Sequence, residues 1–193
     1  TGSCTVSMNA AKSVTATFAR NTLTLNVSKN GDGSGSVTSI PPGIDCGSAC
    51  SSTYTQGTQV TLTAIPAADS SFSGWSGACS GTGGCTVSMD AAKSLTATFT
   101  RNTFTLNVAP YAGLRVVSAP EGIDCGTSCR ATFPSGTEVK LDVVSGGAGS
   151  TIIWAGDCTG MQACKVTMDH DHAIELSLSG RRLYLPSIEC NQP

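Results

Sequence analysis

The 193-residue chain contains few charged residues, few aromatic residues and no long apolar run. Charged side chains make up 12% of the sequence, against about 25% in an average soluble protein. With a formal net charge of −2, the chain lacks the basic field that holds nucleic acid or an anionic membrane. No run approaches the roughly 18 apolar residues of a membrane-spanning helix. We therefore expect neither a nucleic-acid partner nor a membrane span.

Histidine is also scarce, and this argues against an enzyme. The two histidines, His170 and His172, lie in one short segment, whereas a Ser-His-Asp triad needs its histidine in a cleft. The acidic residues are scattered and form no obvious pair for glycoside chemistry. Most cysteines fall into close pairs, which leaves little scope for a thiolate nucleophile. We expect no enzymatic activity and no cofactor.

Cysteine, by contrast, is abundant, and its spacing is regular. Eight of the ten cysteines fall into four short loops: Cys46 and Cys50, Cys79 and Cys85, Cys125 and Cys129, Cys158 and Cys164. A spacing of four residues, as between Cys46 and Cys50, does not exclude zinc. Surroundings rich in threonine and serine argue against it. Disulfides are the simpler interpretation, and they indicate an oxidising, extracellular or cell-surface location. Cys4 and Cys190 remain outside these loops.

The sequence also repeats itself. GIDCGSAC (43–50) recurs as GIDCGTSC (122–129), NTLTLNV (21–27) as NTFTLNV (102–108), and CTVSMNAAKSVTATF (4–18) as CTVSMDAAKSLTATF (85–99) and, more divergently, as CKVTMDHDHAIELSL (164–178). An internal repeat of this length indicates tandem structural units. We divide the chain into a partial repeat (1–20), a first repeat (21–101), a second repeat (102–178) and a C-terminal tail (179–193).

Apolar residues alternate with threonine and serine through most of each repeat, as in 23–27, 60–64, 85–89 and 95–99. A period of two predicts β-strands with one buried and one wet face. We expect MDAAKS (89–94) to be the tight connection of a hairpin. The sequence therefore predicts an all-β protein with two tandem small antiparallel domains, each of six or seven strands.

The order of these motifs resembles a known family. VTLTAIPAADSSFSGWSGACSG (60–81), the closing segment 85–99 and the turn 43–50 together resemble the divergent InlB B-repeat domains of bacterial extracellular proteins. The resemblance covers nearly all of residues 4–178. It implies β-sandwich or β-grasp-like modules arrayed in surface and secreted proteins, and it supplies no catalytic motif. The second repeat departs from the pattern at WAGDCTG (154–160).

Two motifs suggest ligands but have simpler structural interpretations. Trp75 and Trp154 occupy the same repeat position and could stack on sugars, but a ring buried beside a disulfide is the favoured interpretation. Asn30, Asp32 and Ser34 alternate as calcium ligands do, yet the motif lacks a distal acidic ligand. A glycine-rich hairpin turn is the favoured interpretation there.

A third cluster has metal-ligand chemistry. Asp169, His170, Asp171 and His172 replace DAAK of the first repeat. Two alternating ligand pairs can hold a surface ion, but the turn is short and predicted to be exposed. We expect no physiological metal, with these four residues as the only weak candidates.

The two ends of the chain suggest how copies could join. Residues 4–18 match the last part of a repeat, and their inward residues need a sheet to join: Val6, Met8, Val14, Ala16 and Phe18. In one explanation, the sequence is a piece of a longer array; in the other, another chain completes the fold. In the second case the tail can supply a strand through Leu183, Leu185 and Ile188, and a Cys190–Cys4 disulfide can lock the contact.

These observations predict a non-catalytic, extracellular structural or adhesive repeat protein, the subunit of a cell-surface filament or stalk. Its partners would be further copies of itself or other surface proteins. The alternative is a carbohydrate-binding or spacer module of a larger secreted hydrolase or adhesin. Buried tryptophans would argue against glycan binding, and covalent multimers would argue for a filament.

Overall fold

The computed structural model describes residues 2–146, 151–161 and 163–179. This part of the chain contains fourteen β-strands and no helix. The first module contains β1 (Thr22–Asn30), β2 (Gly35–Ile40), β3 (Ser51–Thr55), β4 (Gln59–Pro66), β5 (Ser70–Gly77), β6 (Cys85–Ser88) and β7 (Lys93–Arg101). The second contains β8 (Thr103–Val108), β9 (Arg115–Ala119), β10 (Arg130–Pro134), β11 (Glu138–Ser145), β12 (Thr151–Gly156), β13 (Cys164–Thr167) and β14 (His172–Ser179). Seven strands per module agree with the number expected from the alternation pattern.

Each module is a sandwich of two sheets. In the first module a four-stranded sheet of order β3-β1-β7-β5 lies against a three-stranded sheet of order β2-β4-β6. The second module repeats this arrangement with β10-β8-β14-β12 and β13-β11-β9. The apolar residues of the alternating strands point inward and form one core per module, as sheet-on-sheet packing requires. Leu25, Leu62 and Phe99 are among the residues buried in the first core. The predicted all-β class with two tandem domains is confirmed.

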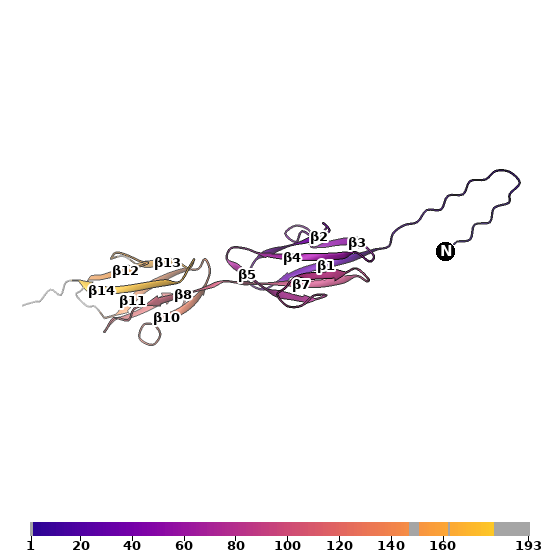
Figure 1. The fold of residues 1–193 in the computed structure, drawn as a ribbon. Helices are drawn as coiled ribbons and strands as arrows, with labels where there is room; N and C mark the ends of the chain where they lie inside the picture. Colours follow the sequence, from indigo (N-terminus) through magenta and orange to yellow (C-terminus); the bar gives the residue numbers. More distant parts are fainter. Residues whose placement is uncertain (1, 147–150, 162, 180–193) are drawn as a thin grey trace, which may run out of the picture.

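One pairing in each module is parallel, whereas the alternation pattern had suggested antiparallel sheets throughout. β1 pairs with β7 in parallel from Leu25↔Lys93 to Asn30↔Thr98. β14 pairs with β8 in parallel over a shorter stretch, from His172↔Leu106 to Ile174↔Val108. Because the first and last strands of a module run in the same direction, the chain enters each module at one end and leaves at the other. The two modules accordingly follow each other end to end (Figure 1).

The connection 89–94 is not a hairpin, which corrects the sequence-based prediction. β6 belongs to the three-stranded sheet and β7 to the four-stranded sheet, so this connection crosses from one sheet to the other. The glycine-rich segment 31–34 crosses between sheets in the same way, from β1 to β2. Alternation shows that one face of a strand is buried, but the pattern is the same on either sheet of a sandwich. It therefore could not identify the partner of each strand.

A single residue joins the modules. β7 ends at Arg101 and β8 begins at Thr103. The backbone N–H of Asn102 donates to the carbonyl oxygen of Asp69 in the first module (2.8 Å), and its carbonyl oxygen accepts from the N–H of Ser135 in the second module (2.8 Å). The junction is therefore hydrogen-bonded on both sides.

Residues 2–20 form no strand and lie away from the modules (Figure 1). The terminal hairpin expected here is not formed. The segment copies the sequence of 85–99, but it has no facing sheet of its own, and a lone hairpin is at best marginally stable in water. Its apolar side chains are consequently exposed, with Met8 at 74% and Phe18 at 91%.

Candidate functional site

Both tryptophans are core residues, as the favoured interpretation expected. Trp75 and Trp154 are each 5% exposed. The indole N–H of Trp75 donates to the carbonyl oxygen of Gly83 (3.1 Å), and its ring packs against Phe72 with centroids 5.0 Å apart. Neither ring presents a face to solvent on which a sugar could stack. The structure thus removes the main sequence argument for glycan binding.

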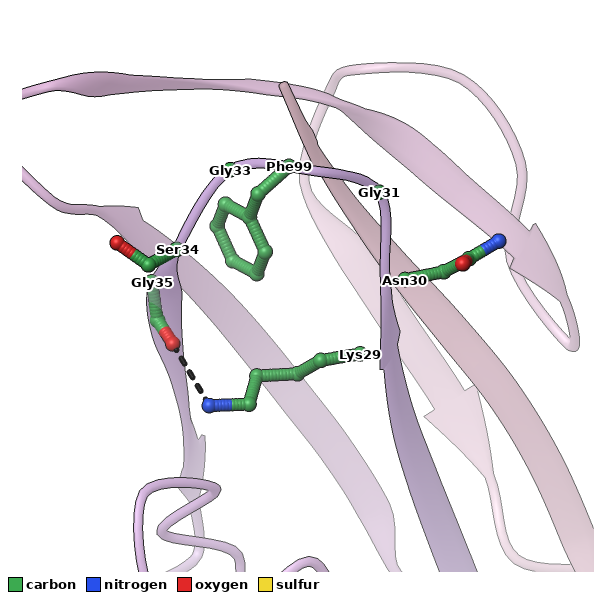
Figure 2. Close-up of a pocket in the computed structure, with 7 residues that line it drawn as sticks. All are labelled: Lys29, Asn30, Gly31, Gly33, Ser34, Gly35 and Phe99. Atoms are coloured by element: carbon green, nitrogen blue, oxygen red, sulfur yellow. Dashed lines mark hydrogen bonds between the residues drawn. The ribbon is translucent and has the colours of Figure 1, made fainter. Parts of the chain in front are cut away.

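The glycine-rich loop packs closely on the end of β7 and leaves a hollow of about 150 Å³ (Figure 2). Asp32 uses Oδ1 to accept a hydrogen bond from the backbone N–H of Arg101 (3.1 Å). The N–H of Ser34 donates to the hydroxyl of Ser70, and the ammonium of Lys29 lies across the hollow on the carbonyl oxygen of Gly35 (3.0 Å). The ammonium of Lys29 thus bridges the two arms of the loop at its open end (Figure 2). Asp32 serves as a backbone cap, and the loop is not arranged as a calcium site.

The four short cysteine loops are closed by disulfides: Cys46–Cys50, Cys79–Cys85, Cys125–Cys129 and Cys158–Cys164. Each bridge fastens a turn at the edge of a core, because Cys46, Cys85, Cys125 and Cys164 are buried. Four disulfides in so small a chain are typical of proteins of an oxidising, extracellular compartment. Cys4 is exposed and forms no disulfide among the described residues. Cys190 and the tail residues Leu183, Leu185 and Ile188 lie outside the described residues.

The histidine-rich turn forms a cluster that extends beyond the residues selected from the sequence. His170 lies between β13 and β14, and His172 is the first residue of β14. Their rings lie side by side, with centroids 4.0 Å apart. Asp157, which directly follows β12, joins them: one ligand atom from each of the three residues lies within 4.8 Å of the others. Asp171 does not belong to the cluster, because its carboxylate accepts from the backbone N–H of Thr105 (2.7 Å).

Hydrogen bonds orient both rings. His172 is 8% exposed and places Nε2 at 2.9 Å from the carbonyl oxygen of Thr167. Since a carbonyl only accepts, Nε2 carries the proton there. His170 places Nδ1 against a carboxylate oxygen of Asp169. The hydrogen bond from His170 lowers the pKa of Asp169, and the backbone N–H of Ala173 lowers the pKa of Asp157. Both carboxylates are therefore held in the charged form.

Asp157 was missed because single-sequence analysis sees only neighbours along the chain. It lies 13 residues before His170 and 15 before His172 in sequence, and in a different loop. A signal was present, however. The first repeat has Ala78 at the position of Asp157, Ala91 at that of His170 and Lys93 at that of His172. These three positions thus differ between the repeats, and the fold brings them together in space.

Comparisons with known proteins give one family match, which lies in the first half of the chain. Residues 25–103 match the divergent InlB B-repeat domain. Among solved structures, the Bacillus anthracis TIE protein is similar at 8% identity and a TM-score of 0.42, over 80% of this chain and 33% of that one. The chain thus spans about a third of that protein's length. No match was found among curated proteins. The described residues contain no helix suited to crossing a membrane. The family whose model matches residues 25–103 is the one that the sequence motifs of the first repeat resembled.

Proposed function

We propose that the chain is a non-catalytic, extracellular spacer or stalk segment that carries tension between its ends. The observation that supports this most directly is the parallel pairing of the first and last strands in each module. This pairing places the two chain ends of a module at opposite ends of the sandwich. Modules of this kind extend in a line when they are joined, and a line of modules is a spacer.

The same pairing gives the module a mechanical property. A force applied along the chain pulls β1 and β7 past each other, so the hydrogen bonds of their ladder are loaded together. If the terminal strands formed a simple hairpin, the bonds would instead open one after another. The ladder spans six residue pairs in the first module and three in the second. We expect the first module to withstand the greater force.

The junction and the disulfides suit the same role. The hydrogen bonds of Asn102 to Asp69 and Ser135 restrain the single linking residue, so the two modules are joined by a short, bonded connection. The two disulfides of each module enclose loops with sequence separations of 4 and 6. These bridges shorten the length that an unfolded module can release.

The exposed segment 2–20 supplies a second element of the proposal, which is self-association. Its residues Val6, Met8 and Phe18 are exposed, whereas Val87, Met89 and Phe99 at the matching repeat positions are buried. Burying such side chains is favourable by about 1.5–3 kcal/mol each. We propose that this segment adds to a sheet edge of a second copy, with Cys4 and Cys190 available to lock the contact. Head-to-tail contacts of this kind generate open filaments when they do not close into a ring.

Single-molecule force spectroscopy on the full chain tests the mechanical role. Two unfolding events are expected, each releasing about 200 Å of chain with the disulfides intact, at about 3.5 Å per residue. Reduction should lengthen each event by about 25 Å, since two short loops are freed. The first module should unfold at the higher force. Unfolding at forces typical of a hairpin that opens bond by bond would contradict the proposal.

Non-reducing gel electrophoresis and intact mass test the assembly. Covalent multimers that collapse to one 19.5 kDa band on reduction are expected for the assembling form. The Cys4→Ser variant should abolish the covalent ladder, and it leaves the four module disulfides unchanged. A monomer at high concentration in both proteins, before and after reduction, would contradict self-association and leave only the spacer role.

A further inference from the structure

We propose that the second module binds one zinc ion between Asp157, His170 and His172. Asp157 and His170 lie in two different connections, which meet at His172, the first residue of β14. They offer one carboxylate and two imidazoles, a ligand set that suits zinc and other late first-row divalent ions. The site is separate from the mechanical role proposed above and does not depend on it.

The spacing of two of the ligand atoms fits a tetrahedral ion. His172 Nδ1 lies 3.2 Å from Asp157 Oδ2. Two ligands that each lie about 2.0–2.1 Å from zinc at a tetrahedral angle are separated by about 3.3 Å. An ion can therefore sit between these two atoms with little movement of either residue. The His170 ring lies beside the His172 ring, with centroids 4.0 Å apart, and brings the third ligand within reach.

The second observation is an unsatisfied buried atom. His172 Nδ1 is buried and makes no hydrogen bond, and Asp157 Oδ2 lies 3.2 Å from it. Buried polar atoms in native proteins almost always have a partner. Since Nε2 of the same ring faces the carbonyl oxygen of Thr167, Nδ1 is the nitrogen that faces Asp157. A carboxylate so close to this nitrogen is satisfied by a positive charge, which either a second proton on the ring or a metal ion between the two atoms supplies.

The surroundings of the rings have the arrangement found around metal-binding histidines. Such histidines generally donate their other ring N–H to a carbonyl or a carboxylate, which fixes the tautomer and the ring orientation. Thr167 plays this part for His172, and Asp169 plays it for His170. Nε2 of His170 is then the nitrogen available to the ion. Asp157 and His170 are exposed, so an ion can reach the site from solvent and complete its coordination with water.

The first module provides a natural counterpart without the site. Ala78, Ala91 and Lys93 stand at the positions of Asp157, His170 and His172, on the same strands and turns. The fold therefore does not need the three ligands. In the second module, a bound ion would fasten the loop after β12 to the start of β14, where the short parallel ladder to β8 begins. It would reinforce the weaker of the two modules.

Isothermal titration calorimetry of the full chain with zinc chloride tests the proposal, after metal removal with a chelator. The experiment uses the Cys4→Ser background, because an exposed thiol binds zinc by itself. One site per chain is expected. The double variant Asp157→Ala and His170→Ala, which restores residues of the first module, should weaken binding at least about tenfold. Calcium and magnesium should not bind, since they prefer sites made of oxygen ligands.

Nuclear magnetic resonance of the imidazole nitrogens supplies a readout that does not depend on affinity. Zinc should shift Nδ1 of His172 and Nε2 of His170, and the Thr167 hydrogen bond should keep Nε2 of His172 protonated. The reciprocal triple change Ala78→Asp, Ala91→His and Lys93→His should create a second site in the first module. Absence of binding in the parent chain, binding that survives the double variant, or coordination through other nitrogens would each overturn the proposal.

Discussion

The carboxylate of Asp32 accepts a hydrogen bond from the backbone N–H of Arg101 at 3.1 Å, across 69 residues of sequence. This contact ties the loop between β1 and β2 to the last residue of β7, next to the junction with the second module. Removal of the acceptor in Asp32→Ala should lower the free energy of unfolding of the first module by about 0.5–1.5 kcal/mol. Urea denaturation measures this change. Asp32→Asn, which keeps a side-chain oxygen, should lose much less, and an equal loss in both variants would contradict the capping role.

Gly31 illustrates why the same loop is rich in glycine. Its φ is +96°, and a Cβ at this position would overlap the carbonyl oxygen of Phe99. Gly31→Ala should therefore destabilise the first module by both backbone strain and a clash, at least about 2 kcal/mol in total. Gly57 is a matched control, because it has a similar φ of +86° with open space around its Cβ position. Gly57→Ala should cost only the strain of about 1 kcal/mol. Thermal unfolding compares the two, and equal losses would show that the close contact with Phe99 is unimportant.

The ion pair between Arg115 and Asp124 predicts an acid-sensitive element in the second module. The guanidinium donates to both carboxylate oxygens, at 2.8 and 2.7 Å. The hydrogen bond from Arg115 lowers the pKa of Asp124 from 3.8. The stabilisation is therefore present above this ordinary value and is lost as the pH falls through the lowered pKa in the folded state. Asp124→Asn should flatten the dependence of stability on pH below about 4. An unchanged acid limb in unfolding curves would exclude the pair as its source.

The sequence was most informative about elements that leave a local pattern, namely the strands and the turns between cysteines. Alternation located the strands at 60–64 and 85–89, and the cysteine spacing located the turns. The position of Trp75 beside a cysteine loop also predicted its burial correctly. The sequence pattern could not predict which strands pair, because the buried face of a strand has the same composition on either sheet of a sandwich. The parallel ladder from Leu25↔Lys93 onwards leaves no local signal, since its partners lie far apart in the chain.

The candidate metal cluster shows the same limit at the level of side chains. His170 and His172 were visible as neighbours, but Asp157 reaches them only because β12 and β14 are paired. Asp171 stands between the histidines in sequence and yet turns to Thr105, since alternate residues point to opposite faces. The prediction from closeness along the chain therefore included Asp171, which lies outside the cluster, and omitted Asp157, which belongs to it.

Phe99 and Phe18 occupy the same repeat position in opposite environments, and this contrast tests the role of the N-terminal segment. Phe99 is 1% exposed and Phe18 is 91% exposed. Phe99→Ala should destabilise the first module by about 3–5 kcal/mol, because it leaves a cavity in the core. Phe18→Ala should leave the unfolding of both modules within about 0.5 kcal/mol of the parent chain.

The same substitution at Phe18 should weaken association between copies, if the segment adds to a neighbouring sheet as we propose. Sedimentation velocity at increasing protein concentration measures this, with Lys12→Ala as a control on the same exposed segment. The control should associate as the parent does, because a lysine contributes little apolar area to such a contact. If Phe18→Ala associates as strongly as the parent chain, the exposed apolar residues of 2–20 are not the contact surface, and strand complementation fails while the spacer role stands.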